Sequence, residues 1–204
     1  MSRIAISVAV CILTVFAAPV SAAMIITDSG SFLSSVQPGA FFNDFSTGGD
    51  PSGARIPDPL SYSGSGFAYT VSAAGGLFAD NDVIGNWLQS SAVVFTFTGA
   101  TVTAIGGNFF MTTTEGVFIT SAPVSIQLSD GTIETFTASS TSAYRGFIST
   151  GPAITSMTLQ PVAGSYNVDN LTVGTAVPEP ATIGLIATAG AIALVARRRR
   201  LSRS

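Results

Sequence analysis

The chain has 204 residues, with 8 Lys+Arg against 11 Asp+Glu, one cysteine and no histidine. The lack of histidine excludes nucleophilic catalysis of the Ser-His-Asp and Cys-His types, and with a single cysteine it excludes the familiar zinc ligand sets. Residues 24–176 contain only two cations, Arg55 and Arg145, against ten carboxylates. Their net charge of about minus eight excludes a phosphate-binding basic patch, so we expect no nucleic-acid partner.

Residues 1–23 have the pattern of a secretory signal peptide. Arg3 precedes an apolar run over Ile4–Phe16, and small residues follow at 20–22 and 21–23. Both triplets fit the positions that signal peptidase reads, so we expect cleavage after Ala22 or after Ala23. The alternative is an uncleaved N-terminal anchor. Because the single cysteine lies in the apolar run, the mature domain would fold without disulfides.

Residues 24–176 are predicted to form one all-β extracytoplasmic domain. Apolar and polar residues alternate over 93–98 and 124–128, which indicates strands with one buried face. Ser129-Asp130-Gly131 is a hairpin signal, no stretch shows sustained helical periodicity, and the spacing of the runs predicts an antiparallel sandwich of jelly-roll type. The expected strands are Met24–Thr27, Phe41–Ser46, Phe67–Ser72, Ala92–Thr98, Val102–Met111, Val117–Thr120, Val124–Leu128, Thr132–Thr137, Tyr144–Ile148, Ile154–Leu159 and Tyr166–Val173.

Three segments between or after these runs have turn or linker composition. Residues 48–59 and 80–87 are predicted to be surface loops, where binding residues usually lie. Gly75-Gly76 and Gly106-Gly107 are expected to mark tight turns or bulges. Residues 174–180 are predicted to be a linker that holds the domain away from the membrane.

Two acids are candidate Ca²⁺ ligands. In a regular final strand Asp169 would share a face with Leu171 and Val173, and Asp44 would share a face with Phe42. A carboxylate on an apolar face is costly unless it is paired or bound to a cation. The first and last strands of a jelly roll often lie side by side, so Asp44 and Asp169 could together hold Ca²⁺. The alternative is that each acid caps a turn or accepts backbone hydrogen bonds.

Trp87 is the only tryptophan and is a candidate ligand-binding residue, because an aromatic ring in a loop can stack on a sugar. The alternative is a core or rim position. Asp80-Asn81-Asp82 offers oxygen ligands in a row but lacks EF-hand spacing, so a solvated turn is expected. Nothing singles out a carboxylate pair for glycoside hydrolysis, and we expect no enzymatic activity, no catalytic residues and no cofactor other than Ca²⁺.

The C-terminal 28 residues have three parts. Two prolines fix φ and remove two backbone donors in the first part, which is therefore extended. Ala181–Ala196 is uncharged and is predicted to be a single transmembrane helix, although its sixteen residues fall short of the roughly twenty of a full span. A basic stop over residues 197–204 would stay cytoplasmic. The extended motif is Val177, Pro178, Glu179 and Pro180, and the stop contains Arg197, Arg198, Arg199 and Arg200.

This tail resembles the PEP-CTERM sorting tail of Gram-negative bacteria. The resemblance covers residues 177–204 and implies recognition by exosortase, a membrane cysteine protease. It also implies export through signal peptidase, transient anchoring in the inner membrane, and a final place at the cell surface or in an exopolysaccharide or biofilm matrix. The segment Val168–Gly174 further resembles the last strand of PEP-CTERM ectodomains and of carbohydrate-binding jelly rolls, some of which hold a structural Ca²⁺. Two functions follow as alternatives: a non-enzymatic surface or matrix protein, or a carbohydrate-binding module stabilised by Ca²⁺. An ordinary tail anchor is the alternative for the tail itself.

Overall fold

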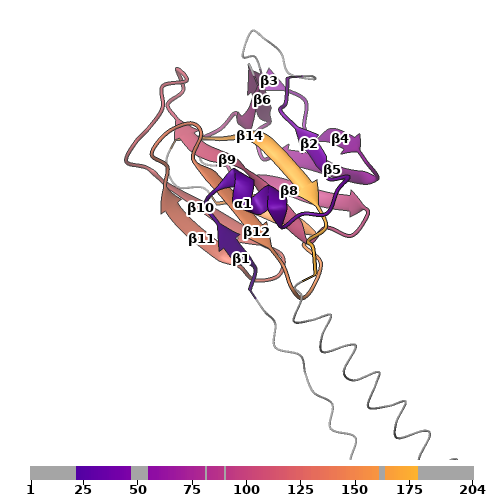
Figure 1. Ribbon diagram of the computed structural model, residues 1–204. Coiled ribbons are helices and arrows are strands. Elements are labelled where there is room, and N and C mark those ends of the chain that lie inside the picture. The colour runs from indigo at the N-terminus through magenta and orange to yellow at the C-terminus, as the bar shows by residue number, and fades with distance from the viewer. Residues whose placement is uncertain (1–21, 47–54, 81, 90, 161–163, 179–204) are drawn as a thin grey trace, which may run out of the picture.

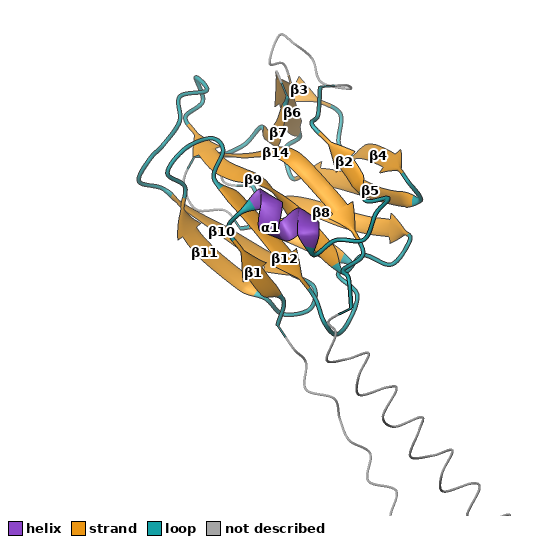
Figure 2. Cartoon of the chain, viewed as in Figure 1, coloured by secondary structure: helices purple, strands orange, loops and turns teal. Residues whose placement is uncertain are grey.

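The computed structural model describes residues 22–46, 55–80, 82–89, 91–160 and 164–178. Within these residues the chain forms two antiparallel sheets and one short helix (Figures 1 and 2). The eight-stranded sheet has the order β1 (Met24–Ile26), β12 (Tyr144–Ile148), β9 (Ala104–Thr112), β14 (Ser165–Gly174), β7 (Val83–Asn86), β6 (Leu77–Asp80) and β3 (Arg55–Ile56), and β2 (Phe41–Asn43) also pairs with β14. The six-stranded sheet has the order β11 (Ile133–Thr137), β10 (Pro123–Leu128), β13 (Ser156–Leu159), β8 (Val93–Gly99), β5 (Phe67–Ala73) and β4 (Leu60–Gly64).

The core lies between the two sheets and follows from the period of two in the strands. In β5 every second residue is buried, and β8 continues the same face with Val93, Phe95 and Phe97. The eight-stranded sheet contributes apolar side chains from β9 and β14 to the same core cluster. The predicted all-β antiparallel sandwich is therefore confirmed, while the finer assignment to the jelly-roll type stays a prediction.

The central strand β9 is buried on both faces, because the helix α1 (Ser29–Ser34) covers the outside of the eight-stranded sheet (Figure 2). Asp28 caps this helix: its Oδ1 accepts the backbone N–H of Ser31 at 2.7 Å. Phe32 is fully buried beneath the helix. It lies on Gly106 and Gly146, which face each other across β9 and β12, and neither position has room for a Cβ beside the Phe32 ring.

Sequence reasoning placed most strands, predicted one strand that does not form, and missed five elements. Each predicted strand except 117–120 overlaps an observed one, and in that segment Phe118 makes only a single bridge to Thr112. The helix α1 was not expected, because six residues are too few to show a helical period. The strand β4 was not expected either, because it is short and contains only two apolar residues, Leu60 and Tyr62.

Two of the predicted loops contain strands. Residues 77–86 form the hairpin β6–β7, with Ala79 and Ile84 buried as register partners. Asp82 has a positive φ of 74° in its turn, so the solvated turn is real but its flanks are strands. In the predicted loop 48–59, residues 48–54 lie outside the described residues, and Arg55–Ile56 pairs with β6 as β3.

Candidate functional site

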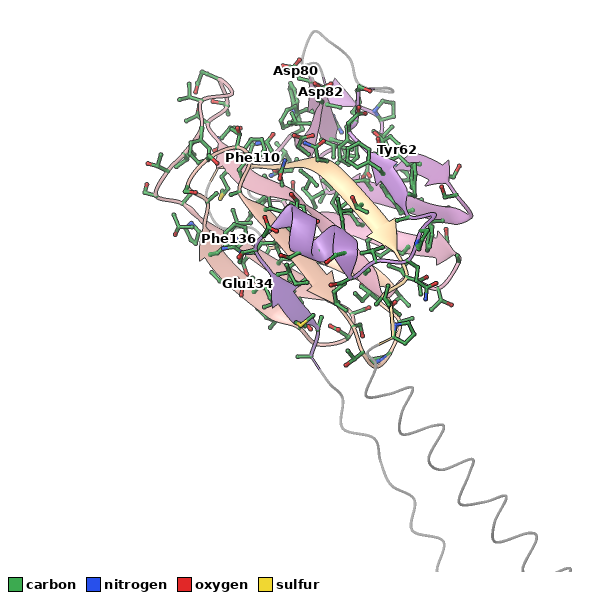
Figure 3. The ribbon with its side chains drawn as sticks, viewed as in Figure 1. Tyr62, Asp80, Asp82, Phe110, Glu134 and Phe136 are labelled. Carbon is green, nitrogen blue, oxygen red and sulfur yellow. The ribbon has the colours of Figure 1, made fainter. Side chains whose placement is uncertain are left out.

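A cleft of about 500 Å³ lies where the hairpin β6–β7 meets the end of β9 and the start of β14. Figure 3 shows Asp80, one of its lining residues, at the end of the domain opposite to β1. Threonine and serine hydroxyls, two carboxylates and two aromatic rings line it together. The described lining residues are Phe78, Asp80, Asn86, Trp87, Thr112, Thr113, Thr114, Glu115, Gly116 and Ser165.

Trp87 is held by its backbone and presents its side chain to solvent. Its N–H donates to the carbonyl oxygen of Gly76 at 3.0 Å, yet the residue is 44% exposed. The preceding residue, Asn86, is fully buried: its Oδ1 accepts the N–H of Tyr166 at 2.6 Å and its Nδ2 donates to the oxygen of Leu88 at 2.5 Å. These bonds fix the backbone that carries the indole. The structure thus places Trp87 on a cleft wall, and not in the core.

Glu115 supplies an ionised carboxylate on the facing wall. It lies in a turn closed by Thr113 and Gly116, where the Gly116 N–H donates to the Thr113 oxygen at 3.1 Å. Hydrogen bonds from Thr113 and Thr114 lower the pKa of Glu115, and the Thr114 hydroxyl donates to Oε1 at 2.8 Å. Glu115 is therefore a hydrogen-bond acceptor at neutral pH. Asp80 from β6 is the second acid, and no described lining residue carries a positive charge.

Neither described cation is among the lining residues of the cleft. Arg145 donates from Nε to Glu134 Oε1 at 3.3 Å, and its guanidinium lies 3.7 Å from the centre of the Phe136 ring. Arg55 lies in β3 beside Gly76, as the register partner of the lining residue Phe78. With two acids and no cation among its described lining residues, the cleft suits an uncharged ligand better than an anionic one.

The predicted Ca²⁺ ligands Asp44 and Asp169 are brought near each other. β2 pairs with β14 at Asn43 and Leu171, so Asp44 follows directly beside the Asp169–Asn170 segment. Burial raises the pKa of Asp169, with smaller contributions from the negative charges of Asp82 and Asp44. Its Oδ2 accepts from Asn170 Nδ2 at 2.6 Å, and its Oδ1 is buried without a hydrogen-bond partner among the described residues.

The premise that Asp169 shares a face with Leu171 and Val173 is wrong. The register of β14 against β9 shifts between Asp169 and Thr172, and Asn170 has φ of 54°. This bulge inserts one residue and turns Leu171 into the core while Asp169 stays on the outer face. Gly107 lies opposite the bulge, close to the backbone carbonyl oxygen of Asp169. The predicted pair Gly106-Gly107 therefore does mark a bulge.

Asp44 fits the alternative interpretation, in which it caps a turn. Its Oδ1 accepts from the Ser46 hydroxyl at 2.7 Å and from the Ser46 N–H at 3.1 Å, and these bonds lower its pKa. Among the described residues no group of three or more His, Cys, Asp or Glu side chains is placed to hold a metal ion. The Ca²⁺ site at Asp44 and Asp169 therefore stays a prediction.

The segment before the sorting motif is bonded to the domain and is not the free linker predicted for residues 174–180. The N–H of Gln37 donates to the Thr175 oxygen at 2.8 Å, and the N–H of Val177 donates to the Ser35 oxygen at 2.9 Å. The N–H of Ala176 donates to Thr103 Oγ1 at 2.8 Å. The segment after α1 is therefore hydrogen-bonded to residues 175–177. The sorting motif begins at the surface of the domain.

Most of the predicted tail lies outside the described residues, which reach Pro178. This applies to Glu179, Pro180, the predicted helix Ala181–Ala196 and the stop Arg197–Arg200, and at the other end to residues 1–21 of the predicted signal peptide. Across the part of the chain that the structure does describe, no helix combines the length and the apolarity needed to cross a bilayer.

Sequence reasoning found Trp87 because it is unique in the chain. It missed Asn86, Glu115 and the hydroxyls of residues 112–114. The run Thr112-Thr113-Thr114-Glu115-Gly116 is a local turn signal, but nothing in it indicates that the turn faces the hairpin β6–β7. That contact depends on the pairing of β14 with both β7 and β9, which is a tertiary feature.

Comparisons with known proteins bear mainly on the tail. No curated protein matches the chain. Among solved structures, the chain is similar to CsCBM6-3 from Clostridium stercorarium in complex with cellobiose, at 17% identity over 60% of this chain and 92% of that one, with a TM-score of 0.29. A likeness this weak carries no argument about ligand or activity. Residues 176–200 match the family description of the PEP-CTERM protein-sorting motif. The chain therefore carries a PEP-CTERM protein-sorting motif, which marks it as a protein directed to the cell envelope or surface.

Proposed function

We propose that this is a non-enzymatic surface or extracellular-matrix protein, processed by signal peptidase and exosortase, whose sandwich binds an uncharged polysaccharide through the Trp87 cleft. The observation that carries the proposal is the exposed indole of Trp87, held by its backbone on the wall of a cleft that also presents hydroxyls and carboxylates. This proposal joins the matrix function implied by the tail with the sugar-binding alternative.

The chemistry of the cleft suits a sugar ring. One face of a pyranose is a patch of C–H groups that can cover an indole, and its edge is a ring of hydroxyls. Glu115 and Asp80 offer acceptors for those hydroxyls, and the threonines around Glu115 offer both donors and acceptors. A uronic acid would meet these carboxylates with like charge, which favours a neutral glycan.

The ionisation of Glu115 favours binding over hydrolysis. A glycosidase needs one carboxyl group with a raised pKa to protonate the leaving oxygen. The hydrogen bonds from Thr113 and Thr114 act in the opposite direction and keep Glu115 ionised. Glu115 is therefore assigned to hydrogen bonding, with no bond-breaking step.

The placement of the cleft agrees with a protein tethered or released through its C-terminus. Pro178, the last described residue, lines a hollow together with Met24 of β1, and Asp80 of the cleft lies at the opposite end of the domain from β1 (Figures 1 and 3). A domain held at its sorting end would thus present the cleft away from the membrane.

The test is binding of the exported chain to an array of neutral and acidic glycans, compared with Trp87→Ala and Phe42→Ala. Phe42 is a matched control, because it is an exposed aromatic residue in β2, outside the cleft. We expect Trp87→Ala to weaken binding by about tenfold or more, as truncation of an aromatic anchor does, while Phe42→Ala binds normally.

Three results would argue against the proposal. Binding that survives Trp87→Ala would remove the cleft as the site. A preference for acidic over neutral glycans would contradict the electrostatic argument. Release of shorter sugars from a polysaccharide panel, lost in Glu115→Gln, would replace the binding function with a hydrolase.

A further inference from the structure

The start of the predicted mature chain is built into the fold. Ala23 is only 7% exposed and packs in the core between the sheets. Its backbone nitrogen donates to Thr132 Oγ1 at 2.6 Å, in a buried hydrogen bond that joins residues 109 apart in sequence. The next residue, Met24, is 46% exposed. Of the two predicted cleavage positions, only cleavage after Ala22 preserves this contact.

A buried carboxylate lies directly behind Thr132. The backbone N–H of Thr132 donates to Asp130 Oδ1 at 2.9 Å, and both residues are at least 95% buried. The second oxygen, Asp130 Oδ2, is buried without a hydrogen-bond partner among the described residues. A carboxylate taken out of water needs a cation or several donors to compensate for its lost hydration. Arg145, one of the two described arginines, is paired with Glu134.

We propose that signal peptidase hydrolyses the Ala22–Ala23 bond and that the new α-ammonium group of Ala23 forms a buried ion pair with Asp130, supported by Thr132. Hydrolysis adds water across the peptide bond, leaving a carboxylate on Ala22 and an ammonium group on Ala23. In the uncut chain the Ala23 nitrogen is an amide with a single N–H, which Thr132 already accepts. The ammonium group has three donors, so it can keep Thr132 and also reach the carboxylate.

The pair would lie between the open edges of the two sheets. Ala23 leads into β1, the edge strand of the eight-stranded sheet, and Asp130 lies in the turn before β11, the edge strand of the six-stranded sheet. Figure 1 shows β1 and β11 on the same side of the domain. Export would therefore complete the fold, since removal of the signal supplies the cation that joins these edges. This inference rests on the predicted signal peptide and is independent of the glycan proposal.

The composition of the chain makes the test specific. The sequence contains no lysine, so the α-amino group is the only primary amine of the protein. The full chain is exported with its own signal, recovered, and analysed by intact mass and N-terminal sequencing. The folded protein and the same protein in denaturant are then treated with an amine-acylating reagent, and the labelling rates are compared.

We expect a chain that begins at Ala23 and is acylated at least tenfold more slowly when folded than when unfolded. Asp130→Asn should recover most of the lost reactivity, whereas Glu115→Gln, which removes a carboxylate at the far end of the domain, should not change it. If Asp130→Asn fails to fold, two measurements on the wild-type protein still test the inference: its N-terminal residue, and the acylation rate of its α-amino group in the folded and unfolded chain. A start at Met1, at Met24 or elsewhere, or an amine as reactive in the folded as in the unfolded chain, would overturn the inference.

Discussion

The packing of Phe32 on two glycines gives a prediction with a calculable sign. In Gly146→Ala the added Cβ would clash with Cδ2 of Phe32 and lie 2.8 Å from its Cγ and 3.1 Å from its Cβ. Phe32 is fully buried between α1 and the sheet, so it cannot turn away without losing its own packing. Overpacking of this kind costs about 1–3 kcal/mol. The gain from replacing a flexible glycine in a strand is smaller, roughly 0.5–1 kcal/mol.

The clash should therefore outweigh the gain, and Gly146→Ala should lower the free energy of unfolding by up to about 2.5 kcal/mol, which is the largest difference between these two effects. The matched control is Gly151→Ala, where no atom lies within 4 Å of the new Cβ. Unfolding in guanidinium chloride, followed by circular dichroism, gives both values. The specific readout is a double-mutant cycle with Phe32→Ala: because the clash needs the ring, Gly146→Ala should cost nothing further in that background. Equal stabilities of Gly146→Ala and Gly151→Ala would refute the docking of α1 on the glycines.

Three further predictions concern the charged and polar groups of the fold and the tail. Burial raises the folded-state pKa of Asp169 above its unfolded value, so stability falls as pH rises between those values, and Asp169→Asn should melt higher than wild type at pH 7. A melting temperature that does not respond to chelator or to added Ca²⁺ would dispose of the predicted Ca²⁺ site. Asn86→Ala should lower the unfolding free energy by roughly 1–3 kcal/mol, because it removes the acceptor of the buried Tyr166 N–H while the Leu88 oxygen keeps its hydrogen bonds from Ser91, and it should also weaken glycan binding by releasing Trp87. Intact mass of the protein from its native host should show a chain that ends near Val177–Pro180, whereas a chain ending at Ser204 in the inner membrane would indicate an ordinary anchor.

The parts of the fold that sequence predicted well are those with local signals. Alternation over Val93–Gly99 and Val124–Leu128 fixed which face of each strand is buried, because the pleat has a period of two. The hairpin at residues 129–131 was also predictable from a local signal. Gly131 adopts a φ of 90°, which glycine tolerates without strain. The tail was identified from its order of motif, apolar run and arginines, none of which depends on tertiary structure.

The parts that sequence missed depend on single residues or on distant contacts. One residue, Asn170, in a left-handed conformation reverses the faces of the last strand, and asparagine is only mildly biased toward that conformation. The cleft combines residues 78–87 with residues 112–116 and 165, which meet only because β14 pairs with both β7 and β9. No periodicity in the chain encodes that pairing. Trp87 could be nominated from sequence, but its partners could not.

Both predicted cleavage sites lie next to residues that are hydrogen-bonded to the body of the domain. Ala23 is bonded to Thr132 at one limit, and Val177 is bonded to Ser35 at the other. A cut after Ala22 and a cut near Val177–Pro180 would each remove a tail without removing a described residue from the core. Since Phe32 anchors α1, and the chain after α1 clamps residues 175–177, loosening Phe32 should also loosen the base of the sorting motif. The stability of α1 and the presentation of the motif to exosortase would then be physically linked.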